Sequence, residues 1–408
     1  MRILFADAID PTTLERLEGL GHACELDPSL DAAGLPSRIA DVDVLVVRST
    51  RVTAEAIAAG RALQLIVRAG AGTDTIDTQA AADVGIYVAN VPGRNAIAVA
   101  ELTMGLLLAI DRRIPDAVAD LRAGRWDKAG YGRADGLYGK TMGIVGLGQI
   151  GLAVAERAAA FGLRLLGLRR PERDGGVRDR IAALGVDLVD GLEELVGRAD
   201  VVSLHVPSTP QTRRLVDARF CGWMREGAIL LNTARGDLID PDALLEAIEA
   251  KGIRVGLDVY PDEPASGRAA WRSALAAHPN VVGTHHVGAS TAQAQRAIAD
   301  GVVEIIDAFT RGEVRDCVNL AKTRLGVCTL HVRHYDRVGV LAQVLDLLRR
   351  GGLNVEQMEN RIFEGGRAAV ATIDVADEVP RELVASIETI PDVLHVAVVP
   401  APGRGNDG

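Results

Sequence analysis

At 408 residues the chain is too long for one ordinary domain, so we expect two or three domains, each able to bury a sizeable core. Hydrophobic residues make up 48% and aromatic residues only 3%, which predicts cores of Ala, Val, Leu and Ile, as in proteins with helices packed on parallel sheets. The formal net charge of −10 argues against nucleic acid and anionic membranes as partners.

Two series of β-rich runs alternate with Ala-rich amphipathic stretches. The first series consists of ILFADA, DVDVLVVRS, LQLIVRAGAG and IYVAN, and repeated βα units of this kind predict a parallel sheet. The second series begins at TMGIVGLGQIG and continues through LRLLGLRR, VDLVD, DVVSLHVP, AILLNTARG, IRVGLDVY and NVVGTHH. Its length predicts a larger doubly wound unit.

A helical pattern over residues 95–113 separates the two series, and another over residues 299–313 follows the second. A first unit that is split around an inserted second unit explains both helices. The expected fold class is therefore α/β. It combines a split flavodoxin-like substrate domain, residues 1–94 and 285–320, with an inserted Rossmann dinucleotide-binding domain, residues 95–284.

Residues 325–400 differ in character from the rest of the chain. They are expected to form, in order, a strand, an amphipathic helix, a β-hairpin, a second helix and a last strand. This βαββαβ order is that of ferredoxin-like modules and predicts a separate small α+β domain. The tail APGRGNDG, residues 401–408, is expected to be disordered.

The opening MRILFADAID lacks the basic and hydrophobic regions of a signal peptide, and the longest apolar stretch, 96–110, is interrupted by Glu101. We therefore expect a soluble cytoplasmic protein. The cysteines Cys24, Cys221, Cys317 and Cys328 show no CxxC spacing, which disfavours a disulfide framework or a zinc site. No metal is expected.

Gly146, Gly148 and Gly151 form the motif GLGQIG between the apolar run TMGIV and the helical pattern LAVAERAAAF. In this context the glycines allow the backbone to approach a pyrophosphate at the N-terminus of a helix. The motif predicts a dinucleotide site, and the alternative is a structural glycine turn.

Three polar blocks follow strands of the second series: NTARGD (232–237), DVYPDEP (258–264) and THHVGAST (284–291). Ligands bind at such strand ends in open α/β sheets. In this order after GLGQIG, the blocks resemble the D-isomer-specific 2-hydroxyacid dehydrogenase family. The resemblance covers residues 1–320, includes VRSTRVTAEAI, AELTMGLLLA and VSLHVPSTPQTRRLV, and is strongest to phosphoglycerate dehydrogenases.

The resemblance implies that Arg235, Glu263 and His286 are the catalytic residues. Oxidation of a 2-hydroxy acid needs a base for the hydroxyl proton, and histidine titrates near neutrality. Glu263 would orient His286 and raise its pKa, and Arg235 would hold the substrate's carboxylate with its planar fork of donors. Taken singly, each residue also fits an ordinary surface or loop role.

One departure from the family is His285, which stands where a proline is usual. The following VGAST identifies His286 as the base. His285 could shift the titration of His286, or an experiment could mistake it for the catalytic base.

The resemblance also implies a set of cofactor-binding residues, in addition to the three glycines. They are Gln149, Ile150, Arg169, Arg170, His205, Pro207, Thr212, Thr233, Ala234 and Asp258.

Arg169 and Arg170 end the second strand of the dinucleotide unit. An acid at this place accepts the ribose 2′-OH of NAD, whereas arginine accommodates the 2′-phosphate of NADP. We therefore expect NADP to be used at least as well as NAD. Glu172 could still reach the ribose, and the alternative is that both arginines merely face solvent.

The resemblance places Arg48, Ser49, Arg68 and Asn95 in the substrate cleft, with the backbone of Ala71 and Gly72 near the carboxylate. Arginines suit a phosphorylated acid. Alternatively, Arg48 and Arg68 could simply end strands in solvent. Lys128 and Arg133 are weaker candidates.

The C-terminal module resembles an ACT domain, through HYDRVGVL followed by GGLNV. His334, Asp336 and Asn354 match positions that hold the effector in serine-inhibited relatives. Asp336 departs from the usual Asn, and a carboxylate there would attract an effector's ammonium but repel its carboxylate. The alternative is a purely dimerising module.

Together the two resemblances imply NAD(P)-dependent oxidation of D-3-phosphoglycerate to 3-phosphohydroxypyruvate, the first step of L-serine synthesis. One alternative is a glyoxylate or hydroxypyruvate reductase or another D-2-hydroxyacid dehydrogenase. Another is a nucleotide-sensing, corepressor-like regulatory protein on the same fold. The resemblance further implies a homodimer or homotetramer.

Overall fold

The computed structural model describes residues 1–170, 173–264, 268–321 and 326–400. The chain divides into two compact units, Met1–Asn319 and Leu320–Gly408. The tail 401–408 and Glu172, for which the sequence makes expectations, lie outside the described residues. Among the described helices, none is both long enough and apolar enough to cross a membrane.

The first sheet of the Met1–Asn319 unit is parallel, with the spatial order β2-β1-β3-β4-β5. Its strands are β1 (Arg2–Phe5), β2 (Ala23–Leu26), β3 (Val44–Val47), β4 (Leu65–Arg68) and β5 (Tyr87–Asn90). The helices between them are α1 (Pro11–Gly19), η1 (Leu35–Ser37), α2 (Ala54–Ala59) and α3 (Thr78–Asp83). This is the flavodoxin-like strand order.

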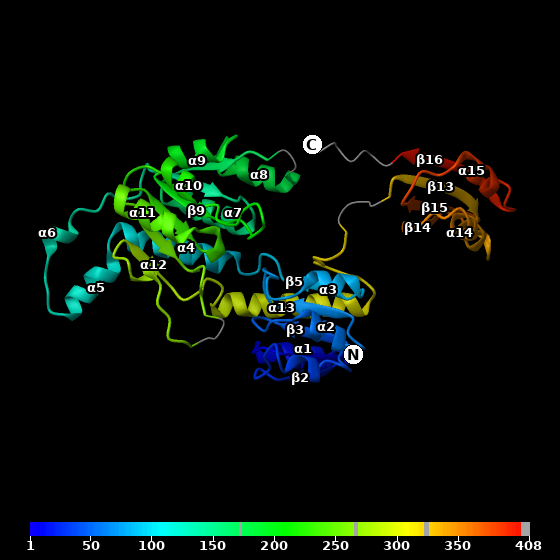
Figure 1. The fold of residues 1–408 in the computed structure, drawn as a ribbon, viewed down its shortest axis with the longest axis horizontal. Helices are drawn as coiled ribbons and strands as arrows, with labels where there is room; N and C mark the ends of the chain where they lie inside the picture. Colours follow the sequence, from blue (N-terminus) through cyan, green and yellow to red (C-terminus); the bar gives the residue numbers. More distant parts are fainter. Residues whose placement is uncertain (171–172, 265–267, 322–325, 401–408) are drawn as a thin grey trace. The chain divides into compact units, whose positions relative to one another are not determined.

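A distant helix, α13 (Ala292–Thr310), packs on this first sheet. Its buried residues Val302 and Ile306 share a core with Ile3 and Phe5 of β1. Figure 1 shows α13 beside the helices and strands of the first sheet. The sheet is thus completed by a helix that follows the second sheet in the chain.

The second sheet has seven parallel strands in the order β12-β11-β10-β9-β6-β7-β8. They are β6 (Thr141–Val145), β7 (Arg164–Leu168), β8 (Asp187–Val189), β9 (Val201–Leu204), β10 (Ile229–Asn232), β11 (Arg254–Leu257) and β12 (Val281–Gly283). The order reverses between β6 and β9, and nucleotides bind at such a switch point.

Helices cover the second sheet, and each face carries its own apolar core. The helices are α4 (Ala96–Asp111), α7 (Gln149–Ala160), α8 (Gly175–Ala183), α9 (Leu192–Arg198), α10 (Ala218–Trp223), η2 (Gly236–Leu238), α11 (Pro241–Lys251) and α12 (Ala274–Ala277). On one face Met104 and Leu107 of α4 pack with Ile144 and Leu231 of the strands. Strands covered on both faces explain the continuous apolar runs of the sequence.

Two helices extend away from the body of this unit, α5 (Ile114–Arg122) and α6 (Lys128–Tyr131) (Figure 1). None of the residues of α5 is buried. Leu121 and Trp126 are 58% and 80% exposed, respectively. The extension therefore presents apolar side chains that the described part of the chain does not cover.

The Leu320–Gly408 unit contains an antiparallel sheet of four strands in the order β14-β15-β13-β16. Its elements are β13 (Cys328–Tyr335), α14 (Val340–Arg350), β14 (Val355–Ile362), β15 (Ala368–Val375), α15 (Arg381–Glu388) and β16 (Val393–Pro400). Leu330 and Val332 of β13 pack against Val344 of α14 and Ile387 of α15. The expected fold class, parallel α/β with a separate small antiparallel domain, is confirmed.

All four cysteines are free thiols. Burial raises the pKa of Cys24 and of Cys221 to about 11, so both stay protonated near neutral pH. Among the described residues, no group of three or more His, Cys, Asp or Glu side chains could hold a metal ion.

Candidate active site

The three polar blocks follow neighbouring strands of the second sheet. Arg235 comes after β10, Asp258 directly after β11, and His286 after β12, and these strands pair in the order β10-β11-β12. Because the strands are parallel, their carboxyl ends share one edge of the sheet. The fold thus gathers the three side chains from positions far apart in the sequence.

His286 and Glu263 form a hydrogen-bonded pair at this edge. His286 Nδ1 lies 2.7 Å from Glu263 Oε1. This hydrogen bond raises the pKa of His286 above its ordinary value. Burial of the ring and the charge of Arg235 act in the opposite direction, but they do not outweigh the hydrogen bond. Burial would raise the pKa of the Glu263 carboxyl, but the hydrogen bond and charge of His286 lower it overall. The ring's free nitrogen is therefore Nε2. The neighbouring His285 is exposed.

Asp258 holds the loop that carries His286. Its carboxylate is 1% exposed and accepts hydrogen bonds from Thr284 Oγ1 at 2.6 Å and from the amides of Val287 and Gly288, each at 2.8 Å. Its carbonyl accepts from the amide of His286 at 2.7 Å. These bonds stabilise His286 in the left-handed region at φ 53°. Asp258, which the sequence assigns to the cofactor, thus also builds the histidine loop.

Arg235 is held by acceptors on both sides of its guanidinium. Nε donates to Asp74 Oδ2 at 2.9 Å, and Nη1 donates to the carbonyl of Ala234 at 2.8 Å. The Asn232 amide donates to the Arg235 carbonyl at 2.7 Å. Asp74 lies in the loop after β4, so this ion pair joins the edges of the two sheets.

Arg68 lies near both Arg48 and Arg235. Arg48 follows Val47, and Val47 pairs in register with Arg68 at the end of β4. Burial, together with the charges of Arg235 and Arg48, lowers the pKa of Arg68 to about 10, so it remains a cation near neutral pH. Its Nε is buried without a hydrogen-bond partner in the described structure. These three guanidiniums form a concentrated positive site, which we call the arginine cluster.

Asp7, at the end of β1, builds the loop that carries Arg48. Its Oδ2 accepts hydrogen bonds from the consecutive amides of Arg48, Ser49 and Thr50 at 2.7, 3.0 and 3.0 Å. The Ser49 amide is therefore already engaged, and its side chain is exposed. This arrangement fixes the backbone from which Arg48 extends.

The backbone of Gly72 lies directly against Arg235 of the arginine cluster. A Cβ on Gly72 would lie 1.9 Å from Arg235 Nη2, so only glycine leaves room for this guanidinium. The Asn90 amide donates to the Ala71 carbonyl at 2.5 Å. Asn95 Oδ1 is buried without a partner in the described structure. Gly72 thus lies against Arg235, and Asn95 keeps an unpaired acceptor in the part of the chain that the structure describes.

The glycine turn after β6 brings its backbone close to neighbouring chain segments. Gly146 has φ 105°, and a Cβ on it would lie 2.4 Å from the His205 carbonyl oxygen. A Cβ on Gly151 would lie 1.9 Å from the Gly146 carbonyl oxygen. A Cβ on Gly148 would meet nothing within 4 Å, and no side chain caps the N-terminus of α7. The turn therefore fits a pyrophosphate on the free amides of α7.

Several of the remaining expected cofactor residues have their polar groups engaged within the chain. His205 Nε2 lies 2.8 Å from Ser203 Oγ, whereas its Nδ1 is buried without a partner in the described chain. Burial lowers the pKa of His205 to about 4, so its ring is neutral. Thr212 Oγ1 donates to the Pro207 carbonyl at 2.6 Å, and Thr233 Oγ1 lies 2.8 Å from Thr103 Oγ1.

Two further expected cofactor residues lie on α7. A Cβ on Gly93 would lie 1.9 Å from Gln149 Oε1, so the Gln149 side chain reaches the loop before α4. Ile150 is partly buried against the core of the second sheet. Their backbone amides belong to the uncapped first turn of the helix.

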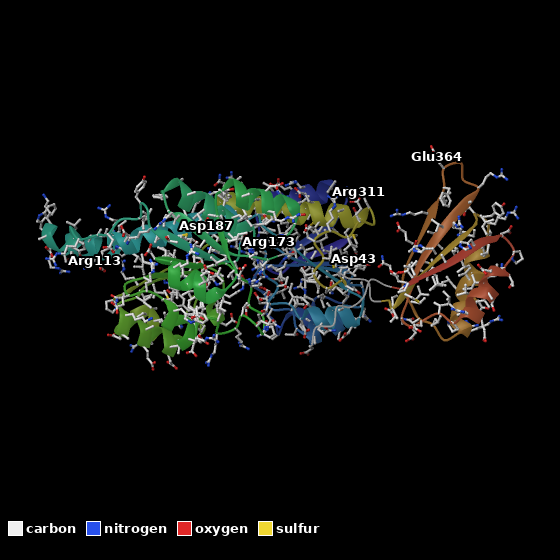
Figure 2. All side chains as sticks on the ribbon, turned by 90° about the horizontal axis from the view of Figure 1, so that it is seen from above. Asp43, Arg113, Arg173, Asp187, Arg311 and Glu364 are labelled. Atoms are coloured by element: carbon white, nitrogen blue, oxygen red, sulfur yellow. The ribbon has the colours of Figure 1, made fainter. Side chains whose placement is uncertain are left out.

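Three arginines gather at the carboxyl end of β7. Arg169 Nε donates to Asp190 Oδ1 at 2.8 Å, and its Nη2 donates to the Leu188 carbonyl at 3.1 Å. Arg170 is exposed. Arg173, labelled in Figure 2, donates from Nη2 to the Leu168 carbonyl at 2.7 Å, and burial and the charge of Arg170 lower its pKa. Arg169 is thus turned toward β8, and Arg173 joins the two predicted arginines.

Within one chain, the expected effector residues do not lie together. His334 is 2% exposed. Its Nδ1 donates to the Tyr335 carbonyl at 2.8 Å, and its Nε2 lies 3.2 Å from Asn360 Oδ1. His334 pairs with Ala369 at the start of β15, whereas Asn354 bonds to Ala376 beyond its end. Asp336 and Asn354 are both exposed.

Lys128 and Arg133 lie on and just after α6, on the extension and apart from the strand ends that carry the clusters (Figure 1). By contrast, Asp7, Asp74, Asn90 and Arg173 lie at the candidate sites without having been expected there. Asn90 is the last residue of β5 and Asp7 closely follows β1, and this position at a strand end was a signal that the sequence offered, whereas Asp74 lies farther along the loop after β4.

Comparisons with known proteins identify the family of the chain. The model of the D-isomer specific 2-hydroxyacid dehydrogenase NAD binding domain matches residues 104–288. A D-3-phosphoglycerate dehydrogenase of Methanocaldococcus jannaschii is 41% identical over 354 residues, which are 85% of this chain and 65% of that protein. A hydroxypyruvate reductase of Thermotoga maritima is 43% identical over 304 residues, 73% of this chain and 95% of that protein.

Among solved structures, the TT0316 protein from Thermus thermophilus superposes with a TM-score of 0.69 and 35% identity, and the match covers 78% of this chain and 100% of that one. The similarity thus extends over most of this chain and over the whole of that structure. The chain belongs to the D-isomer-specific 2-hydroxyacid dehydrogenase family.

Proposed function

We propose that this protein oxidises D-3-phosphoglycerate to 3-phosphohydroxypyruvate with a nicotinamide cofactor, as the first step of L-serine synthesis. The observation that carries this proposal is the arginine cluster beside the hydrogen-bonded pair of His286 and Glu263. A substrate with a carboxylate and a phosphate matches several guanidiniums at one edge. The 41% identity to a D-3-phosphoglycerate dehydrogenase supports the same substrate.

His286 acts as the general base in the proposed reaction. Because Nδ1 is bonded to Glu263, Nε2 takes the proton of the substrate's 2-hydroxyl group. The carboxylate of Glu263 stabilises the imidazolium that results. Arg235 binds the substrate carboxylate and places C2 for transfer. A nicotinamide cofactor held by the glycine turn and the first turn of α7 would supply the acceptor for the hydride of C2.

We also propose that residues 1–94 and 285–320 form the substrate domain, residues 95–284 the nucleotide domain and residues 325–400 an ACT domain. The separate cores of the two parallel sheets support this division. A homodimer through the extension of α5 and α6 is supported by the exposed Leu121 and Trp126.

The reaction is tested by measuring steady-state rates with D-3-phosphoglycerate, glyoxylate and hydroxypyruvate, each with both cofactors. The proposal predicts the highest kcat/KM for D-3-phosphoglycerate. A preference for hydroxypyruvate or glyoxylate would favour a reductase, which the 43% identity to the Thermotoga enzyme makes the second candidate. Turnover of no substrate would favour a regulatory, nucleotide-sensing protein.

The pH dependence of the reaction is expected to change when Glu263 is replaced by glutamine. Glu263 raises the pKa of His286, so its loss lowers that pKa and moves the acid limb of the oxidation profile to lower pH. The kcat falls as well, because the ring loses its charged partner. The measurement is kcat/KM from about pH 5 to 9.

The control for this change is Glu249→Gln. In the wild type the Glu249 carboxylate lies 3.0 Å from His278 Nε2, away from the carboxyl ends of the strands where His286 lies. This control should leave the profile unchanged. An acid limb that stays in place, or moves to higher pH, in the Glu263→Gln enzyme would contradict the role of this pair.

We propose that NADP is used at least as well as NAD, because arginines gather at the end of β7. Arg169→Asp should then weaken NADP by one to two orders of magnitude, since a charge-assisted hydrogen bond contributes roughly 1.5–3 kcal/mol. The control is Arg164→Asp, at the opposite end of β7, which should leave the ratio of kcat/KM values unchanged. A wild-type preference for NAD of tenfold or more would show that these arginines do not set the preference.

Serine sensing by the C-terminal unit is also proposed, and its βαββαβ topology supports it. Because the ring of His334 is buried and engaged, an effector would contact Asp336 rather than His334. Serine should lower the rate. Asp336→Asn should lower the half-inhibiting concentration of serine roughly two- to fivefold, the size of effect of one exposed charge, because asparagine does not repel the carboxylate of serine. Unchanged activity in millimolar serine would remove the proposal.

A further inference from the structure

Asp74, in a loop of the first sheet, forms an ion pair with Arg235. It lies in the loop after β4, its side chain is 60% exposed, and its Oδ2 lies 2.9 Å from Arg235 Nε. Arg235 itself stands after β10 of the second sheet. One carboxylate of the first sheet therefore contacts the guanidinium that the proposed reaction needs for the substrate.

The contacts around Arg235 leave a defined set of donors free. Of the five N–H groups of a guanidinium, one is given to Asp74 and one to the Ala234 carbonyl. The Nη2 group lies against Gly72, where a Cβ would stand only 1.9 Å away. The plane of the guanidinium is thus fixed from three sides, and its remaining N–H groups are available for an anion.

Charge also requires a partner at this place. Arg235 and Arg48 both lower the pKa of Arg68, which means that the three cations repel one another, whereas Asp74 and Asp7 act in the opposite direction. Asp7 is bound to the backbone of the Arg48 loop. Asp74 is therefore a carboxylate that offsets the repulsion on Arg68 and at the same time forms an ion pair with the guanidinium of Arg235.

We propose that Asp74 is a positioning residue: it holds Arg235 in the orientation in which its free N–H groups receive the carboxylate of the 2-hydroxy acid. This inference rests on the proposed function. The competing explanation is an ordinary exposed ion pair that only joins two loops, and such pairs contribute little to stability.

The test compares Asp74→Ala and Asp74→Asn with Asp135→Ala. Asp135 is a matched control, because its side chain is also 60% exposed and it pairs with Arg254 at 3.4 Å, on β11. For each variant we would measure the KM and kcat for D-3-phosphoglycerate, its binding by calorimetry, the Kd of the cofactor and the Tm. Calorimetry measures the affinity of the substrate for this site without any turnover.

Asp74→Ala is expected to raise the KM for the substrate roughly ten- to a hundredfold, the effect of losing one charge-assisted contact, with the cofactor Kd and the Tm unchanged. Asp74→Asn keeps an acceptor oxygen and should fall between Asp74→Ala and the wild type. Asp135→Ala should match the wild type. In an Arg235→Ala background, Asp74→Ala should add no further loss, since the two residues act through one contact.

A KM and substrate affinity within twofold of the wild type in Asp74→Ala would overturn the positioning role while leaving the proposed function intact. Full additivity with Arg235→Ala would do the same. A wild-type protein that neither binds nor oxidises D-3-phosphoglycerate would overturn both the proposed function and this inference.

Discussion

Replacing His286 by asparagine is expected to lower the kcat for oxidation of D-3-phosphoglycerate by about 10²–10⁴, the contribution of a positioned general base. Asparagine is the sharper substitution because His286 has φ 53°, a conformation that asparagine tolerates and alanine does not favour. The histidine loop held by Asp258 should therefore stay in place. Cofactor affinity and Tm should remain those of the wild type.

The control is His285→Asn, which changes the exposed neighbour on the same loop and should keep kcat within a few-fold of the wild type. An active His286→Asn enzyme, or a larger loss in His285→Asn, would show that the base has been assigned to the wrong residue. Rate profiles against pH for both variants separate loss of the base from a shift in its titration.

Replacing Arg235 by alanine is expected to lower kcat/KM by roughly 10²–10⁴, because two hydrogen bonds to a charged group contribute about 1.5–3 kcal/mol each. Most of this loss should appear in KM, since the contact is made to the substrate carboxylate in the ground state as well. Arg235→Lys keeps the charge but not the fork, so it should recover only part of the loss.

The matched control is Arg254→Ala, an arginine of the next strand that pairs with Asp135 outside the candidate site. Its kcat/KM should equal that of the wild type. If Arg235→Ala changed the Tm but left kcat/KM unchanged, Arg235 would be a structural residue.

Much of the fold could be predicted from the sequence, because the relevant signals are local. The buried run of β6, the glycine turn and the helix α7 are adjacent in the chain, so TMGIVGLGQIG already predicts a strand, a turn and a helix. The alternation of apolar runs and amphipathic stretches likewise predicts parallel sheets. The structure and the comparisons confirm this fold class.

The candidate site was predictable only where residues stand at strand ends. Arg235, Asp258 and His286 follow three consecutive strands, so a parallel sheet brings them to one edge. The contact of Asp74 with Arg235 joins residues 161 positions apart on two different sheets. Neither periodicity nor motif spacing carries information about such a pair.

For Arg169 the sequence predicted the position of the residue but not the direction of its side chain. Its place at the end of β7 follows from the pattern, but its direction depends on Asp190 at the end of the neighbouring strand β8. The partner of an exposed arginine is set by tertiary packing, and spacing does not encode it. The same holds for His334, whose burial within its own unit removes it from an effector.

In the proposed reaction, hydride passes directly from C2 of a D-2-hydroxy acid to the nicotinamide while His286 takes the hydroxyl proton. The most direct test uses D-3-phosphoglycerate that carries deuterium at C2, with mass spectrometry of the reduced cofactor. We expect the deuterium to appear in the reduced cofactor, and we expect the L-isomer to give no labelled cofactor. Release of the deuterium to water, or no reduced cofactor from either isomer, would contradict it.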